Sequence, residues 1–184
     1  MMQDLAMHTL EILMNSIGAK AGIVTCRIRD SETDNIISIE VEDNGCGMDE
    51  EMVRRVADPF TTSRKTRKVG LGVAFMKGLT EQCNGTFSIE STVGQGTTVK
   101  ATVQRDHIDL PPMGDLGEMI MYAIQADENT DLRFYYTTDK DQFVFLTSEV
   151  REQLEGVSLL EPEILVWIRE YINEGIIHAK EGME

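Results

Sequence analysis

The chain has 184 residues, and its 41% hydrophobic and 27% charged residues are typical of a folded globular protein rather than a disordered one. Its 32 acidic and 17 basic residues give a net charge of −15, which repels nucleic-acid phosphates and anionic lipids. The three cysteines are far apart, and no apolar run approaches the ~20 residues of a membrane-spanning helix. We therefore expect a cytoplasmic protein without disulfides, a zinc site, or nucleic-acid and membrane partners.

Helical and strand patterns follow one another in the first part of the chain. Apolar residues at helical spacing predict a largely buried first helix, whereas the strict alternation from Ile37 to Val41 predicts a half-buried strand. The predicted elements are a helix at 4–20, strands at 23–29 and 36–42, helices at 49–57 and 71–82, and strands at 86–92 and 97–104. This order predicts a mixed or antiparallel sheet that helices cover on one face.

The acidity is concentrated in the second part of the chain. Residues 1–106 hold 12 basic and 15 acidic residues, whereas residues 107–184 hold 5 and 17. The change falls in a stretch with prolines and a glycine, so we predict a domain at 1–106, a connector at 107–114 and a small acidic α/β appendage at 115–184. The elements predicted there are a helix at 115–126, strands at 132–137 and 142–147, a short helix after Ser148, and a helix at 162–174 that ends at Gly175.

Two polar residues share one face of the first predicted helix. Glu11 and Asn15 are four residues apart, so their side chains lie one turn from each other. The amide oxygen of Asn15 suits a Mg²⁺ ion that shares its coordination with water and phosphates, and a carboxylate at Glu11 can orient or deprotonate a nucleophile. Taken alone, the pair is more typical of the solvated edge of a helix.

A glycine-containing turn follows the second predicted strand, with the sequence Asp43-Asn44-Gly45-Cys46-Gly47-Met48. Its glycines permit positive φ angles and a close approach of the backbone to a ligand. The carboxylate of Asp43 can accept a hydrogen bond from an exocyclic amine while Met48 packs on a flat ring. A single Asp-Asn-Gly sequence is also typical of a simple turn.

A basic loop leads into the helix predicted at 71–82. Four of the five residues from Arg64 to Lys68 are cationic, and Gly70 and Gly72 follow them where that helix begins. Free N–H groups at a helix N-terminus beside cations make a favourable polyphosphate site. A last motif, from Gly94 to Val99, predicts a glycine hairpin between two strands.

Together and in this order, the four segments resemble the N, G1, F/G2 and G3 boxes of the GHKL superfamily, named after gyrase, heat-shock chaperone, histidine kinase and mismatch-repair ATPases. The resemblance covers roughly residues 4–104. It implies an α+β fold of the Bergerat type, a two-layer sandwich in which helices cover a mixed, mostly antiparallel sheet. It also implies that ATP binds between the helices, beneath a mobile lid.

The resemblance assigns a role to residues in each motif. Asn15 would bind Mg²⁺, Asp43 would read adenine, and Glu11 stands where many of these ATPases carry their general base. Thr97 would help Asp43 through a water molecule. The base pocket would be lined by Gly45, Gly47 and Met48. The lid and the phosphate contacts would come from Phe60, Thr62, Ser63, Arg64, Gly70, Leu71 and Gly72.

One position departs from the histidine-kinase pattern. Gly18 stands where those kinases commonly have a basic residue, three positions after the asparagine. Lys20 is suited either to reach the phosphates instead or to serve only as a helix-end cation. Because 14 residues precede Asn15, we expect no dimerisation domain with a phospho-accepting histidine in this chain, and no autophosphorylation of the usual kind.

Two functions remain open on this basis. The first is an enzyme that binds Mg·ATP and transfers the γ-phosphoryl group to water or to a serine or histidine of a partner protein. The second is a non-catalytic module whose nucleotide-ordered lid presents a surface to a partner, with the acidic appendage as adaptor. A DNA-repair or topoisomerase ATPase ranks last, because the acidic second part is a poor DNA surface.

Overall fold

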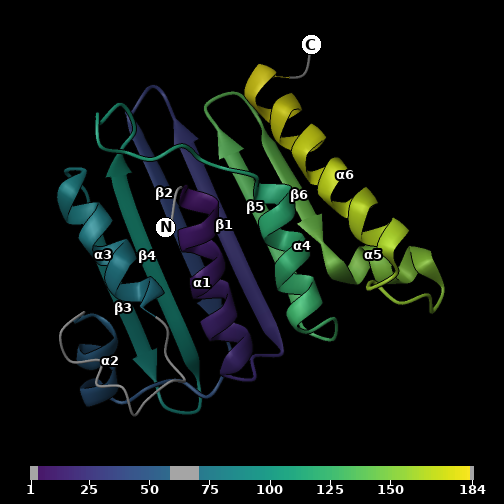
Figure 1. Ribbon diagram of the computed structural model, residues 1–184, viewed down its shortest axis with the longest axis horizontal. Coiled ribbons are helices and arrows are strands. Elements are labelled where there is room, and N and C mark those ends of the chain that lie inside the picture. Colours follow the sequence, from purple (N-terminus) through teal and green to yellow (C-terminus); the bar gives the residue numbers. More distant parts are fainter. Residues whose placement is uncertain (1–3, 59–70, 183–184) are drawn as a thin grey trace.

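The computed structural model describes residues 4–58 and 71–182, which form a two-layer α+β sandwich (Figure 1). This confirms the predicted fold class. In chain order the elements are α1 (Leu5–Gly18), β1 (Ile23–Ser31), β2 (Ile36–Asp43), α2 (Glu50–Val56), α3 (Gly72–Gln82), β3 (Thr86–Thr92), β4 (Gly96–Gln104), α4 (Leu116–Ala126), β5 (Asp131–Thr138), β6 (Gln142–Leu146), α5 (Thr147–Leu154) and α6 (Pro162–Glu181).

All six strands belong to one mixed sheet, in the order β3-β4-β2-β1-β5-β6. Every neighbouring pair is antiparallel except β1 and β5, which run parallel. Parallel neighbours need a long crossover connection, and here the chain returns from β4 through residues 105–115 and α4 before it enters β5. The sheet is therefore mostly antiparallel, as predicted.

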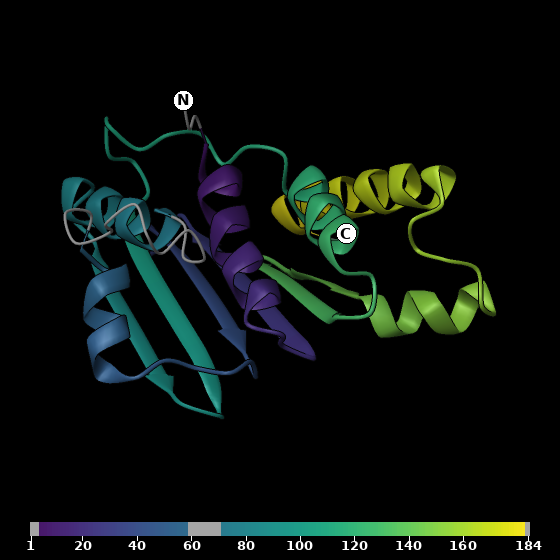
Figure 2. The same ribbon diagram turned by 60° about the horizontal axis from the view of Figure 1, so that its bottom comes forward.

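The two faces of the sheet differ in polarity because side chains alternate along each strand. On β1, Val24, Cys26 and Ile28 are buried under the helices. Arg27 points to the opposite face, where its guanidinium forms ion pairs of 2.9 Å with Glu40 and Glu42. Helices α3, α1, α4 and α6 lie side by side over the apolar face (Figure 2). Within the described residues, none of the helices combines the length and apolar character that crossing a bilayer requires.

Residues 115–182 share the sheet and the core with residues 4–106. Phe134 and Tyr136 on β5 are fully buried in one apolar cluster that also contains Leu13 of α1 and Val41 of β2. Helix α4 packs between α1 and α6. The appendage thus extends the sheet of the first part. Its status as a separate domain stays a prediction, since a shared core does not decide whether either part folds alone.

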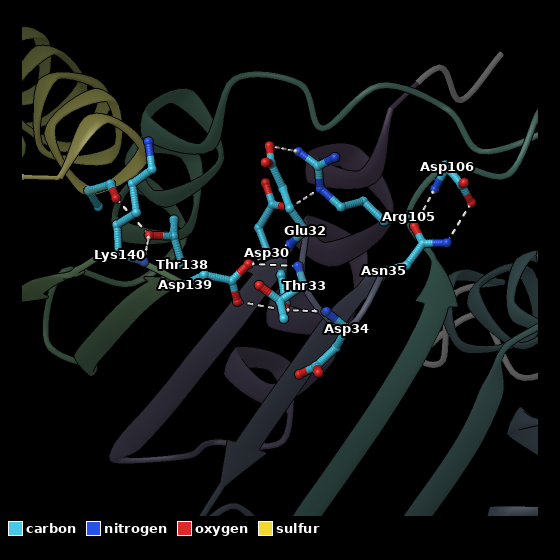
Figure 3. Close-up of polar contacts among 12 residues, drawn as sticks. Asp30, Glu32, Thr33, Asp34, Asn35, Arg105, Asp106, Thr138, Asp139 and Lys140 are labelled. Atoms are coloured by element: carbon cyan, nitrogen blue, oxygen red, sulfur yellow. Dashed lines mark hydrogen bonds and ion pairs between the residues drawn. The ribbon is translucent and has the colours of Figure 1, made fainter.

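A polar cluster joins the β5–β6 turn to the β1–β2 turn at one end of the sheet (Figure 3). The carboxylate of Asp139 accepts hydrogen bonds from the Ser31 hydroxyl (2.6 Å) and from the backbone N–H groups of Glu32 (2.7 Å) and Thr33 (2.9 Å). These bonds lower the pKa of Asp139 to about 2, chiefly through the Ser31 hydroxyl. Asp139 therefore acts as a clasp between the two parts of the chain.

Helix α6 is longer than the sequence predicted. It continues past Gly175 to Glu181, whereas we expected it to end at 174. The Phe143 ring of β6 occupies the space that a Cβ atom of residue 175 would need. Gly175 is thus explained by close packing of α6 on the sheet edge and not by a helix end.

Candidate functional site

A cavity of about 300 Å³ lies beneath α1, on the side of the sheet formed by β2, β4 and β3. Its volume is at the lower end of the ~300–1,000 Å³ range of small-molecule sites. The predicted residues Asn15, Asp43, Gly47, Met48 and Thr97 all line it. The remaining lining residues are Ile12, Ser16, Gly18, Ala19, Cys46, Met52, Val56, Val73, Ile89 and Val99. The structure thus gathers residues from three of the four sequence motifs around one largely apolar space.

Asp43, the last residue of β2, places a nearly buried carboxylate in this cavity. One carboxylate oxygen, Oδ2, accepts a hydrogen bond of 2.7 Å from the Ser16 hydroxyl of α1. The other, Oδ1, accepts one of 2.8 Å from the backbone N–H of Gly45. The two bonds hold the carboxylate in one orientation, and each oxygen retains acceptor capacity for a ligand donor.

The turn after β2 is held against the end of α1 by backbone contacts. The Cys46 N–H donates a hydrogen bond of 3.0 Å to the Ala19 carbonyl. A Cβ atom on Gly45 would lie 2.8 Å from the same carbonyl oxygen, so only glycine allows this approach. Gly47 has a φ of +66°, and the Thr92 carbonyl occupies the space that its Cβ would need. Both glycines approach protein backbone here, and their predicted contact with a ligand stays a prediction.

A serine outside the predicted set links this turn to the β3–β4 hairpin. The Met48 N–H donates a hydrogen bond of 2.8 Å to the Ser91 hydroxyl. The same hydroxyl lies 2.8 Å from the Thr97 hydroxyl and donates to the Gly96 carbonyl at 3.0 Å. Ser91 therefore positions two of the residues that line the cavity.

The polar face of α1 lies between the cavity and the beginning of α3. Asn15 lines the cavity, whereas Glu11, one turn earlier, packs against Gly72 so closely that a Cβ on that glycine would overlap the Glu11 side chain. His8, another turn back, is partly buried, and burial lowers its pKa although Asp4 opposes this. Glu11 is thus next to the helix start that the sequence predicts to be a phosphate site.

Only Leu71 and Gly72 of the residues predicted to form the lid and contact the phosphates lie within the described part of the chain. Leu71 is exposed immediately before α3, and Gly72 is its buried first residue. Five predicted residues lie outside the described residues: Phe60, Thr62, Ser63, Arg64 and Gly70. Their roles therefore stay predictions.

Sequence reasoning missed Ser16, Ser91 and the apolar walls of the cavity. Ser16 is adjacent to Asn15 and was available in the motif, but its importance depends on the fold bringing Asp43 to α1. Ile89 and Val99 face the cavity because they lie on the same side of the β3–β4 hairpin as Ser91 and Thr97. Their alternation with exposed residues was the signal that could have found them.

Comparison with known proteins finds a family model, curated relatives and solved structures that are similar to this chain. The family model described as "Histidine kinase-, DNA gyrase B-, and HSP90-like ATPase" matches residues 3–107. The chain is 36% identical over 109 residues to the "Non-motile and phage-resistance protein" of Caulobacter vibrioides, a match covering 54% of this chain and 13% of that protein. It is 33% identical over 90 residues to the "Signal transduction histidine-protein kinase AtoS" of Escherichia coli, covering 48% of this chain and 15% of that kinase.

Two solved structures are similar at low sequence identity. The Aquifex aeolicus MutL ATPase domain complexed with ADP has a TM-score of 0.49 at 17% identity, over 84% of this chain and 68% of that one. The catalytic domain of histidine kinase ThkA has a TM-score of 0.38 at 17% identity, over 54% of this chain and 66% of that one. The chain spans only 13% and 15% of the length of the two relatives named above. Because the family model matches more than half of its length, the chain belongs to the histidine kinase-, DNA gyrase B- and HSP90-like ATPase family.

Proposed function

We propose that the cavity binds the adenine base of ATP. The observation that supports this is the Asp43 carboxylate, nearly buried in an apolar cavity and oriented by Ser16 and Gly45. A buried carboxylate is costly unless donors satisfy it, and the exocyclic amine of adenine would supply a further donor. The apolar walls and Met48 would pack on the two faces of the ring.

Asn15 and Glu11 would act at the phosphate end of the nucleotide. Among the described residues no cluster of three or more His, Cys, Asp or Glu side chains is placed to bind a metal, so an ion here would depend largely on phosphates and water. One amide oxygen beside the cavity fits that requirement, and Asn15 provides it. Bound Mg²⁺ would neutralise charge on the phosphates. Glu11 would orient the nucleophile that attacks the γ-phosphorus, which is either water or a hydroxyl or imidazole of a partner protein.

Titration calorimetry with Mg·ATP tests the binding proposal. Wild-type protein should bind, and Asp43→Ala should lose affinity by about 100-fold or more, because a desolvated hydrogen bond from the amine to a charged acceptor is lost. Asp34→Asn is the matched control, since that carboxylate is exposed in the β1–β2 turn and pairs with Arg29. Equal affinities in all three proteins would contradict the assignment of the cavity.

Labelled ATP distinguishes turnover from binding alone. In Glu11→Gln, release of label as phosphate or its transfer to a partner should fall at least ~100-fold while ATP affinity stays within about twofold. Glu81→Gln, at an exposed position near the end of α3, is the control. Unchanged turnover in Glu11→Gln would remove the role proposed for that carboxylate.

A nucleotide-gated interaction module is the second candidate. On α6 the Trp167 and Tyr171 rings stack at 5.0 Å and are each 43% exposed, and aromatic side chains are enriched in protein interfaces. In this case ATP would change the affinity for a partner without being consumed. Partner binding that is equal with ATP, with ADP and without nucleotide would remove this candidate.

The free cysteines Cys26, Cys46 and Cys83 suit the cytoplasmic location that we propose for either function.

A further inference from the structure

Asp43, Thr97 and Ser91 form a row across three neighbouring strands. The strand register places Asp43 of β2 opposite Thr97 of β4, and Thr97 opposite Ser91 of β3. Residues in register on adjacent strands point to the same face of a sheet. Asp43 and Thr97 line the cavity, and Ser91 lies next to Thr97 on the neighbouring strand, on the side away from Asp43.

The hydrogen bonds of Ser91 determine which way the proton of the Thr97 hydroxyl points. A serine hydroxyl has one hydrogen to donate and two lone pairs that accept. One lone pair accepts the Met48 N–H at 2.8 Å, and the hydrogen is directed at the Gly96 carbonyl at 3.0 Å. The remaining contact, of 2.8 Å to the Thr97 hydroxyl, is then a hydrogen bond in which Thr97 donates.

The opposite assignment is less favourable. If Ser91 donated to Thr97, its oxygen would face the Gly96 carbonyl oxygen at 3.0 Å with no hydrogen between them. That arrangement loses one hydrogen bond and brings two acceptors together, which costs about 1 kcal/mol or more. With its proton committed to Ser91, Thr97 has only lone pairs left to offer to the cavity.

We propose that Ser91 is a positioning residue that makes the Thr97 hydroxyl an acceptor toward the bound base. The Asp43 carboxylate and the Thr97 hydroxyl then present two neighbouring hydrogen-bond acceptors to the edge of a ligand, and neither group presents a donor. This pair of acceptors favours a base edge that carries an amine. The amine donates to it directly, or donates to a water molecule that in turn donates to Thr97. The pair disfavours a base with a carbonyl at that position. The inference rests on the proposed binding of ATP in this cavity.

The test compares affinities for ATP and for inosine triphosphate, which carries a carbonyl oxygen where ATP has its amine. The readout is the ratio of the two dissociation constants, which a uniform loss of binding would not change. In Ser91→Ala, the Thr97 hydroxyl is free to turn and donate to the carbonyl. The preference for ATP should therefore fall about five- to tenfold, the equivalent of one hydrogen bond. Ser91→Thr keeps the hydroxyl and should retain the wild-type ratio.

Matched variants test whether Ser91 acts through the Thr97 hydroxyl. Ser88→Ala, at an exposed position on the same strand, should leave the ratio unchanged. Thr97→Val removes the hydroxyl on which Ser91 acts, so adding Ser91→Ala to it should change the ratio no further. If Ser91→Ala does not fold, Ser91→Cys, whose thiol is a weak hydrogen-bonding group, should give the same fall.

The outcomes separate this inference from the proposed function. If ATP binds and Ser91→Ala leaves the ratio unchanged, the role of Ser91 is wrong while the site stands. If the effect of Ser91→Ala persists in the Thr97→Val background, Ser91 does not act through Thr97, and the inference is equally overturned. If wild-type protein binds neither nucleotide, the proposed function fails first.

Discussion

Helices cover both halves of one face of the sheet, the β5–β6 half and the β2–β4–β3 half, but the space between helices and sheet is filled differently in the two halves. On the β5–β6 side, the rings of Phe134 and Phe145 and the side chain of Ile168 occupy the space between sheet and helices, and each is at most 2% exposed. On the β2–β4–β3 side, the corresponding layer contains small residues such as Ser16 and Ala19, and a cavity of about 300 Å³ remains. Protein interiors are otherwise close-packed, so a space of this size beneath the helices distinguishes this half of the sheet from the other.

The difference also separates the tasks of the two parts of the chain. All the residues that line the cavity belong to the first part of the chain, residues 4–106. Residues 115–182 supply the better-filled core, the parallel strand beside β1 and most of the net negative charge. The second part therefore supports β2, the strand that ends in Asp43, because β5 pairs with β1 and β1 pairs with β2.

The largest expected effect is on the filled side. Phe134→Ala should lower the free energy of unfolding by about 3–5 kcal/mol, because it removes a fully buried ring from the shared core. Ile89→Ala, in the wall of the cavity, should cost only about 1–2 kcal/mol, since that side chain is partly exposed and already borders open space. Urea unfolding followed by circular dichroism measures both.

The same experiment tests whether the two parts unfold together. Trp167 reports on the second part alone, and circular dichroism reports on the whole chain. Coincident transitions by both probes indicate one cooperative unit. Two separated transitions would instead support the predicted domain boundary, because the filled half of the sheet would not then stabilise the half that contains the cavity.

Replacing either of two glycines by alanine should change stability, but in opposite directions, because Gly175 is closely packed and Gly78 is not. Gly175→Ala should destabilise the protein by about 1–3 kcal/mol, because the added methyl group meets the Phe143 ring. Gly78→Ala in α3 should stabilise it by about 0.5–1 kcal/mol, since the methyl group meets no atom within 4 Å and alanine favours the helix. Melting temperatures of the two variants measure the difference. A shift in the same direction for both would contradict the packing described for α6.

The smallest expected effect concerns the clasp at Asp139. Its pKa is about 2 in the folded protein and below its ordinary value, so its contribution to stability is complete above about pH 4. That contribution is lost as the pH falls from about 4 to about 2. The melting temperature of Asp139→Asn should therefore lie below that of wild type at pH 7, and the gap should close toward pH 2.

Glu152→Gln, which neutralises an exposed carboxylate on α5, is the control for Asp139→Asn. Its melting temperature should follow that of the wild-type protein through the same range of pH. A gap for Asp139→Asn that stays constant from pH 7 to pH 2 would show that the charge of the clasp contributes nothing.

Much of the fold was predictable because its elements carry local signals. The alternation at 36–42 and the helical spacing at 4–20 predicted elements that the structure confirms to within about two residues at each end. Five residues of the candidate site, with Asp43 and Asn15 among them, were predicted from motifs and do line one cavity. Such motifs are readable because glycine, aspartate and asparagine have narrow conformational or chemical uses.

Other features could not be predicted because they depend on distant partners. The parallel pairing of β1 with β5 joins segments about 100 residues apart, and strand patterns specify a face but not a neighbour. Gly175 reads as a helix end until Phe143 is placed beside it. Ser91 is an ordinary strand residue until the register sets it opposite Thr97. In each case the missing information is a tertiary contact.

A crystal structure of the chain with Mg²⁺ and a non-hydrolysable ATP analogue would show directly whether the cavity binds the nucleotide. We expect the adenine ring inside the cavity beneath α1, with its exocyclic amine within hydrogen-bond distance of the Asp43 carboxylate. We also expect the metal beside the Asn15 amide oxygen. A nucleotide bound elsewhere on the protein, or a cavity that stays free of nucleotide at saturating concentration, would contradict this proposal.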